Sequence, residues 1–282
     1  MNPVHPVAGH VRLARPRPHE RRGRSPDPLL AASCYRRGAA ALAALLACAC
    51  SSASPTAVQP VPENALRVLF IGNSLTYAND LPAMLRTLAD SASVDRPLHV
   101  DAVAFADFSL EDHWADARAR RALNDGSWDV VIMQQGPSTL PQNRVHLASW
   151  SERWADAIRE NGGRPALYMV WAQASGDLAA VSESYRAAAE HVNGMLLPAG
   201  EAWRAAFRRD AAVPLYAGDN FHPSVDGTYL AAVVMLGILY DVDVTTAVSS
   251  FDMPGATIRL NEARAELLRA SAAEANDGFG RR

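Results

Sequence analysis

The chain has 282 residues, of which 49% are hydrophobic and 20% are charged, as expected for a globular protein with a substantial core. Its formal net charge of −3 is unevenly spread: residues 1–50 contain eight arginines and two acids, whereas residues 51–282 contain 19 arginines and 28 acids. Nucleic-acid binding requires a basic surface, so this balance argues against a nucleic-acid partner. All three cysteines lie in residues 1–50, which leaves the remainder without a disulfide framework, a thiol nucleophile or a zinc–thiolate site.

The segment 36–54 has the plan of an export signal, in which two arginines precede an apolar stretch and then small residues. The apolar stretch, Gly38–Cys50, is shorter than the roughly 20 residues of a membrane-spanning helix. The sequence LLAC at 45–48 resembles a bacterial lipoprotein cleavage box, which would place a lipid on Cys48. The alternative is a plain signal peptide cleaved within 49–54. We therefore expect an exported protein, either periplasmic or anchored to a membrane through an N-terminal lipid.

From residue 66 onward, short β-branched or apolar runs alternate with amphipathic stretches, a pattern typical of βαβ units and a parallel sheet. The expected strands cover 66–72, 98–105, 128–134, 166–173 and 194–200. The expected helices cover 81–92, 110–123, 145–161, 178–191, 224–240 and, as a polar tail, 256–277. The predicted organisation is an N-terminal extension with the export signal (1–50), a flexible linker (51–63), one α/β domain (64–250) and a C-terminal helical tail (251–282).

In FIGNSLTY (70–77), a glycine, an amide and a hydroxyl follow the apolar run of the first expected strand. Ligands of open parallel sheets bind beyond the carboxyl ends of the strands, so a turn here would expose the hydroxyl of Ser74 at a binding edge. The N-terminus of the next helix would offer backbone N–H groups to a developing oxyanion. The alternative is ordinary turn chemistry, which favours the same residue types.

A second stretch, YAGDNFHPSVDGTYLAA (216–232), places Asp219 and His222 three residues apart, just before a long apolar helix. This spacing lets the carboxylate reach one imidazole nitrogen while the other nitrogen faces outward. A base oriented by a carboxylate is what a weak serine nucleophile requires. Taken alone, Asp219 could be a turn residue and His222 a surface side chain, but together with Ser74 they favour nucleophilic catalysis.

These two stretches resemble the first and last blocks of the SGNH/GDSL hydrolases, with GNS in place of the more usual GDS. The similarity covers most of 66–240 in order and spacing, and it assigns 64–250 to a domain of this type. The resemblance implies a flavodoxin-like three-layer α/β/α sandwich with a five-stranded parallel sheet. It also implies that Ser74 attacks an ester carbonyl, that His222 is its base and that Asp219 orients His222.

The family's second block supplies a glycine whose backbone N–H joins that of the serine in the oxyanion hole. Here FADFSLEDHW (105–114) has Ala106 and Asp107 where glycine is expected. A backbone donor survives any side chain except proline, although the turn is harder to form without glycine. The resemblance therefore implies an oxyanion hole that includes the amides of Ser74 and of Ala106 or Asp107.

The family's third block supplies a side-chain Asn to the oxyanion hole, and MQQGPSTLP (133–141) contains none. Gln134, at the end of the third expected strand, is the best amide donor in its place, with Ser138 as a weaker choice. The alternative is that Gln134 is a buried side chain that satisfies the backbone of its own loop. The stretches IGNS, QQGPS and HPSVDGTYLAA look like a divergent branch of the family.

Other residues are candidates for lining a substrate pocket. They are Asn73, Tyr77, His113 and Trp171. His113 could instead pack the start of its helix, and Trp171 could belong to the core. Neither a metal-binding spacing among the histidines nor a dinucleotide-binding or zincin motif is present in the sequence, so we expect no cofactor and no metal.

Taken together, the sequence predicts an exported serine esterase that hydrolyses small acyl esters, such as acetyl groups on a carbohydrate or envelope glycan. Its expected partner is therefore a small-molecule or glycan ester. One alternative is a catalytically degenerate, glycan-binding surface lipoprotein, motivated by the altered second and third blocks. Another is an acyltransferase, since a sugar hydroxyl can intercept the same acyl-enzyme that water hydrolyses.

Overall fold

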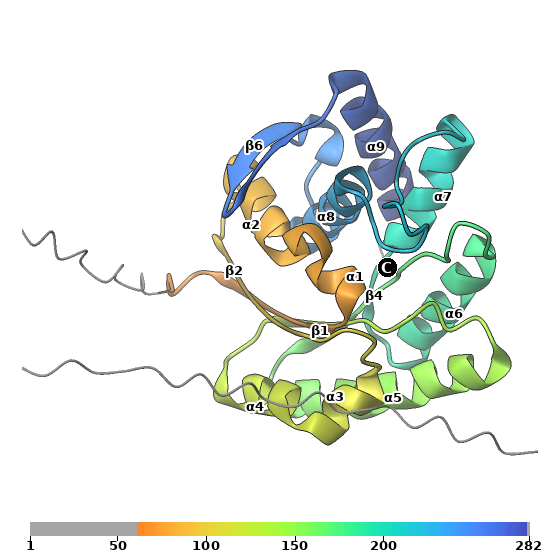
Figure 1. Ribbon diagram of the computed structural model, residues 1–282. Coiled ribbons are helices and arrows are strands. Elements are labelled where there is room, and N and C mark those ends of the chain that lie inside the picture. Colours follow the sequence, from red (N-terminus) through yellow and green to blue (C-terminus); the bar gives the residue numbers. More distant parts are fainter. Residues whose placement is uncertain (1–60, 281–282) are drawn as a thin grey trace, which may run out of the picture. The chain divides into compact units, whose positions relative to one another are not determined.

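A computed structural model describes residues 61–280, so the expected export signal and Cys48 lie outside the described residues. At its centre is a five-stranded sheet in the order β2-β1-β3-β4-β5, in which every neighbouring pair is parallel (Figure 1). The strands are β1 (Leu66–Gly72), β2 (Leu98–Ala104), β3 (Val130–Met133), β4 (Arg164–Tyr168) and β5 (Met195–Leu197). The predicted α/β class and its five-stranded parallel sheet are confirmed.

Helices cover both faces of this sheet (Figure 1). On one face lie α2 (Leu81–Ser91), α7 (Ala199–Arg209), α8 (Val225–Tyr240) and α9 (Glu262–Ala275). On the other lie α3 (Leu110–Asp116), α4 (Arg118–Asp125), α5 (Pro141–Glu160) and α6 (Leu178–His191). Among residues 61–280, none of the helices combines the length and the apolarity that crossing a membrane would require.

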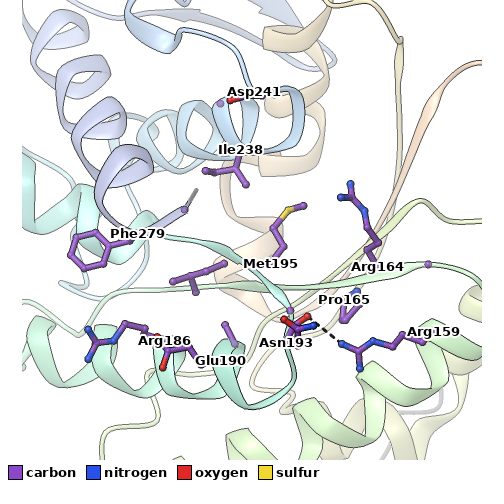
Figure 2. Close-up of a pocket in the computed structure, with 16 residues that line it drawn as sticks. Arg159, Arg164, Pro165, Arg186, Glu190, Asn193, Met195, Ile238, Asp241 and Phe279 are labelled. Atoms are coloured by element: carbon purple, nitrogen blue, oxygen red, sulfur yellow. Dashed lines mark hydrogen bonds between the residues drawn. The ribbon is translucent and has the colours of Figure 1, made fainter. Parts of the chain in front are cut away.

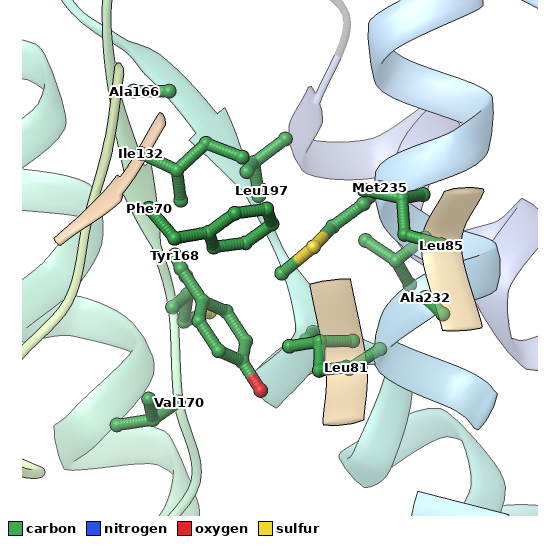
Figure 3. Packing of buried hydrophobic residues seen from close by; sticks show 14 of the residues in the cluster. Phe70, Leu81, Leu85, Ile132, Ala166, Tyr168, Val170, Leu197, Ala232 and Met235 are labelled. Atoms are coloured by element: carbon green, nitrogen blue, oxygen red, sulfur yellow. The ribbon is translucent and has the colours of Figure 1, made fainter. Parts of the chain in front are cut away.

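The central strands β1, β3 and β4 are mostly apolar, because helices cover both faces of the sheet. All four residues of β3, VVIM, are fully buried. Figure 3 shows Phe70 and Ile132 of the sheet facing Leu81 of α2 and Met235 of α8. Burying a side chain of this size contributes about 1.5–3 kcal/mol, so this layer is a main source of stability.

The register of the strands brings three chain exits to one edge of the sheet. Gly72 at the end of β1 lies opposite Ala104 of β2, and Ile71 lies opposite Met133 of β3. The segments that begin at residues 73, 105 and 134 therefore leave the sheet side by side. These segments carry the predicted nucleophile and the predicted oxyanion donors.

Two expected helices differ from the structure. The helix expected over 110–123 is two helices, α3 and α4, separated by Ala117 in a left-handed conformation at φ 70°. The expected polar tail helix begins only at Glu262, because a hairpin of β6 (Ser250–Met253) and β7 (Ala256–Arg259) precedes it. The hairpin turn holds Gly255 at φ 79°, a conformation that glycine adopts without strain.

The tail helix α9 is also more deeply buried than a polar tail would be. Its side chains Leu268 and Ala272 are fully buried, and α9 lies against α7 and α8 (Figure 1). The helix α7 was not predicted at all. The C-terminal residues are therefore packed against the α/β layers and do not form a separate tail.

Candidate functional site

Ser74 is the first residue of a short helix, α1 (Ser74–Tyr77), directly after β1. Asn73 caps this helix: its Oδ1 accepts a hydrogen bond from Leu75 N at 3.1 Å, and its backbone oxygen accepts from Thr76 N at 2.9 Å. These bonds are typical of an N-cap, which satisfies amides that would otherwise have no partner. They leave Ser74 at the carboxyl edge of the sheet, with 8% of its surface exposed.

The side chains of Ser74, His222 and Asp219 form a hydrogen-bonded chain. His222 Nε2 lies 2.8 Å from Ser74 Oγ, and His222 Nδ1 lies 2.5 Å from Asp219 Oδ2. A carboxylate can only accept, so Nδ1 donates to it and Nε2 presents its lone pair to the serine hydroxyl. This arrangement can take a proton from the hydroxyl and hold the resulting imidazolium beside a negative charge.

Asp219 is fixed by its own loop. Its Oδ1 accepts hydrogen bonds from the backbone N of Phe221 at 3.0 Å and of His222 at 2.9 Å. The hydrogen bond from His222 and these two backbone bonds lower the pKa of Asp219 to about 2. Asp219 is therefore ionised throughout the neutral range, as the partner of an imidazolium must be.

The loop that carries His222 is anchored through its backbone. Its four consecutive carbonyl groups, at residues 220–223, all accept hydrogen bonds. The donors are, in order, Ala174 N at 2.9 Å, Trp171 Nε1 at 3.0 Å, Ala217 N at 2.8 Å and Asn79 Nδ2 at 3.0 Å. The loop that carries the base is thus held both by the segment that follows β4 and by the segment that follows Ser74.

Trp171 is one of these anchors, and its prediction as a pocket residue is wrong. Its side chain is fully buried and stacks on Trp203 with ring centroids 3.8 Å apart. Its indole N–H donates to the carbonyl of Phe221, the residue before His222. Trp171 therefore supports the loop from beneath and offers no surface to a substrate.

The segment after β2 makes the turn that was expected to be difficult without glycine. Asp107 adopts φ 60°, and Phe108 N donates to Phe105 O at 3.3 Å to close the turn. Aspartate tolerates this left-handed conformation better than most residues, which explains how the turn forms here. Ala106 and Asp107 are both exposed. Their role as oxyanion donors, together with Ser74 N, stays a prediction.

Gln134 does not have the role predicted for it. Its Nε2 donates to Asn73 Oδ1 at 2.8 Å and to Gln135 O at 2.7 Å, so both amide hydrogens are already engaged. Its Oε1 accepts from Asn73 N at 2.8 Å and from Thr76 Oγ1 at 2.7 Å. The prediction that this amide binds an oxyanion is wrong, and the alternative holds: Gln134 is a buried side chain that fixes the turn before Ser74.

Gly72 makes this arrangement possible. A Cβ at this position would lie 2.2 Å from Thr76 Oγ1 and 2.5 Å from Gln134 Oε1, which is too close for any side chain. The glycine before Asn73 is therefore required for the close approach of Gln134. Ser138, the weaker candidate donor, donates to Gly136 O at 2.9 Å within its own loop.

Two further predicted pocket residues are buried instead. Asn73 is 6% exposed, and its Nδ2 donates to Phe108 O at 3.1 Å, so it joins the serine turn to the turn after β2. His113 is fully buried, in ring contact with Phe105 and Phe108. The alternative considered for His113, that it packs the start of its helix, therefore holds. Of the four pocket candidates, Tyr77 alone is well exposed, at 47%, three residues after Ser74.

A sizeable cavity in the described part of the chain lies away from Ser74. It measures about 800 Å³ and is lined at the amino ends of β4 and β5 by Arg164, Pro165 and Met195, with Ile238 and Phe279 opposite (Figure 2). Ser74 lies at the carboxyl ends of the strands, so this cavity belongs to the other edge of the sheet. In the described part of the chain, no group of three or more His, Cys, Asp or Glu side chains could hold a metal ion.

Comparison with protein-family models and with curated proteins gives no match. Among solved structures, a protein assigned to the SGNH hydrolases, from Slackia heliotrinireducens, is 28% identical with a TM-score of 0.53, over 61% of this chain and 98% of its own. A DUF4886 family protein from Bacteroides uniformis is 18% identical with a TM-score of 0.63, over 76% and 95%. An acetyl xylan esterase is 14% identical with a TM-score of 0.50, over 60% and 97%.

Proposed function

Because the chain is a serine ester hydrolase of the SGNH/GDSL family, we propose that Ser74, His222 and Asp219 are its catalytic triad and that it acts on small acyl esters. The observation that carries this proposal is the 2.8 Å contact between Ser74 Oγ and His222 Nε2. A serine hydroxyl is a weak nucleophile, and it needs a base within about 2.6–3.2 Å and a third group that orients the base. Asp219 meets the second requirement.

The proposed reaction proceeds through an acyl-enzyme. Ser74 Oγ attacks the ester carbonyl carbon while its proton passes to His222 Nε2, and Asp219 stabilises the imidazolium. His222 then gives this proton to the alcohol oxygen as the ester C–O bond breaks. Water next loses a proton to His222 and attacks the acyl carbon, which releases the acid and restores Ser74. The backbone N–H groups of Ser74 and of Ala106 or Asp107 are the proposed donors to the oxyanion.

The substrate class is supported by the openness of the site. The His222 side chain is 36% exposed and that of Asp219 is 52% exposed, so a bulky alcohol such as a sugar can approach the base from solvent. Behind Ser74, Leu75, Thr76 and Gln134 are all buried, which favours a small acyl group over a long chain. Acetyl esters of a polysaccharide are the substrates named for one structural neighbour.

The test uses p-nitrophenyl acetate, p-nitrophenyl octanoate and acetylated xylo-oligosaccharides with the wild type and Ser74→Ala. We expect acetate release by the wild type, a much slower reaction with the octanoate, and a loss of roughly 10⁴-fold or more in kcat for Ser74→Ala. Equal hydrolysis by the two proteins would overturn the mechanism. Preference for octanoate would overturn the small-acyl assignment alone.

The inactive, glycan-binding alternative is favoured by one observation, the engagement of both Gln134 amide hydrogens within the protein. A fluorophosphonate probe separates the two. Covalent labelling that is lost in Ser74→Ala supports the esterase, and glycan binding without labelling supports the alternative. Transfer to an added sugar alcohol in place of water would identify an acyltransferase with the same residues.

We also propose export, with a lipid on Cys48, on the basis of the N-terminal sequence alone. Cells that express the full chain should incorporate labelled palmitate into the protein. Cys48→Ala should abolish the label and Cys50→Ala should retain it. Labelling of neither the wild type nor Cys50→Ala, with secretion intact, would indicate a plain signal peptide.

A further inference from the structure

The serine and its base come from distant parts of the chain, and two residues join these parts by hydrogen bonds. Ser74 and His222 are 148 positions apart. Among residues 61–280, Asn79 is the one member of the segment 73–80, other than Ser74, that hydrogen-bonds to the segment 216–228. Its Nδ2 donates to Pro223 O at 3.0 Å and to Thr228 Oγ1 at 2.8 Å.

Asn79 lies where few other residues would fit. It follows α1 with φ 50° and ψ 23°, a left-handed conformation that glycine, asparagine and aspartate tolerate best. A carbonyl oxygen such as that of Pro223 can only accept, so the atom that faces it must be the amide nitrogen. Aspartate would bring a carboxylate to this carbonyl, and glycine would bring nothing. Asparagine alone combines the backbone conformation with two hydrogen-bond donors on one nitrogen.

The two acceptors lie on either side of the start of α8. Pro223 directly follows His222, and Ser224 is the N-cap of α8. Thr228 Oγ1, which accepts from Asn79, in turn donates to Ser224 O at 3.1 Å. Asn79, five residues after Ser74, therefore holds the residue next to the base and the first turn of the helix that follows it.

We propose that Asn79 is a positioning residue that sets the separation between Ser74 Oγ and His222 Nε2. The inference rests on the proposed function, because it assumes that these two atoms exchange the proton. Displacements of about 1 Å at such a pair cost about 100-fold in rate. The loss should fall on kcat, because Asn79 touches neither the acyl group nor the alcohol.

The experiment compares Asn79→Gly and Asn79→Asp with the wild type on p-nitrophenyl acetate. Both variants keep a residue that tolerates the left-handed conformation, and both lose the donor to Pro223. We expect kcat to fall 10- to 100-fold with KM within twofold of the wild type, and fluorophosphonate labelling of Ser74 to slow by the same factor. Thr228→Val should give a smaller loss, and Thr228→Ser, which keeps the hydroxyl, should restore the rate.

The matched control is Asp80→Asn. Asp80 is the neighbouring left-handed residue, and its Oδ1 caps α2 by accepting from Ala83 N, which asparagine can also do. This variant should keep the wild-type kcat. Rates are compared per folded molecule, from far-UV circular dichroism and active-site titration, so that a loss of stability alone does not count.

The outcomes separate the two proposals. Wild-type kcat in folded Asn79→Gly, with Ser74→Ala inactive, would overturn the positioning role and leave the esterase in place. An equal fall in kcat for Asp80→Asn would also overturn it, since the effect would then belong to the whole turn. Equal activity of the wild type and Ser74→Ala would overturn the proposed function, and the role of Asn79 with it.

Discussion

His113 Nε2 lies 2.7 Å from the carbonyl oxygen of Gly72, two residues before Ser74. A carbonyl only accepts, so Nε2 carries the proton and the buried Nδ1 is an acceptor that has no partner within residues 61–280. The same carbonyl accepts from Phe105 N at 3.2 Å. The carbonyl of Gly72 is therefore held by a neutral imidazole from α3 and by a backbone amide from the segment that follows β2.

This burial predicts a pH dependence of stability. Burial lowers the pKa of His113 below its ordinary value, against the opposing effect of the hydrogen bond to Gly72. As pH falls through about 6.5, the unfolded chain takes up a proton that the folded protein resists, so stability falls by at most about 1.4 kcal/mol per pH unit. Urea denaturation of the wild type and His113→Phe at pH 8 and pH 5.5 measures this. The wild type should lose more stability than the variant on acidification, and equal losses would contradict it.

Asp219→Asn should remove most of the activity and leave the fold intact. An amide N–H facing His222 Nδ1 would favour the tautomer with its proton on Nε2, which cannot accept the serine proton. We expect a fall in kcat of about 10³- to 10⁴-fold with p-nitrophenyl acetate. Far-UV circular dichroism serves as the control for folding. Loss of less than tenfold would mean that Asp219 is not the orienting group.

The low pKa of Asp219, about 2, also shapes the pH profile of the reaction. A carboxyl with a depressed pKa stays ionised as pH falls and is protonated only near that value. Between pH 4 and pH 8, kcat/KM should therefore show no protonation step that belongs to this carboxylate. A protonation step in this range that is lost in Asp219→Asn would show that the carboxylate is not held as the structure has it.

The stacked indoles provide a matched pair of variants. Trp171 Nε1 donates to Phe221 O, whereas the buried Nε1 of Trp203 has no partner in the described residues. Replacing either by Phe keeps an aromatic ring and removes one N–H, at a cost in stability of about 1–3 kcal/mol. Trp171→Phe should lower kcat about tenfold, while Trp203→Phe should leave it within twofold. Equal kcat values in the two variants would exclude a role for the Trp171 bond.

Gln134→Leu distinguishes the two roles considered for this side chain. It would leave the amide of Asn73, the hydroxyl of Thr76 and other buried groups without their partner. Each buried group that loses its partner costs about 1–3 kcal/mol, so we expect the free energy of unfolding to fall by about 2–5 kcal/mol. Guanidinium denaturation measures this. Unchanged stability with a 100-fold loss of kcat would restore Gln134 as an oxyanion donor.

The elements that the sequence predicted well carry local signals. The range of β1 matches its apolar run, and α6 begins after Asp177, whose side chain caps it by accepting from Ala179 N and Ala180 N. The break at Ala117 has no such signal, because alanine rarely adopts a left-handed conformation. The hairpin after α8 did have one, the Pro254–Gly255 pair, which marks a turn.

The role of a site residue could be predicted where its own chemistry determines that role. It could not be predicted where the neighbouring residues in the fold determine it. Asp219 and His222 are close in sequence, so their contact could be inferred from spacing. Gln134 was singled out as an oxyanion donor, and Trp171 and His113 as pocket residues, yet the donors of all three face groups of the protein itself. Which acceptor a buried amide or indole meets depends on packing between strands, and one chain does not reveal it.

All four carbonyls of residues 220–223 accept hydrogen bonds, so the loop that carries His222 would have to break these bonds in order to move. Such a loop is preorganised, so free and inhibitor-bound forms should superimpose here, and turnover needs no lid to open. Preferences among substrates then have to arise from exposed residues near the serine, such as Tyr77. Directed evolution of this enzyme can vary these exposed residues widely while the acid–base machinery stays untouched.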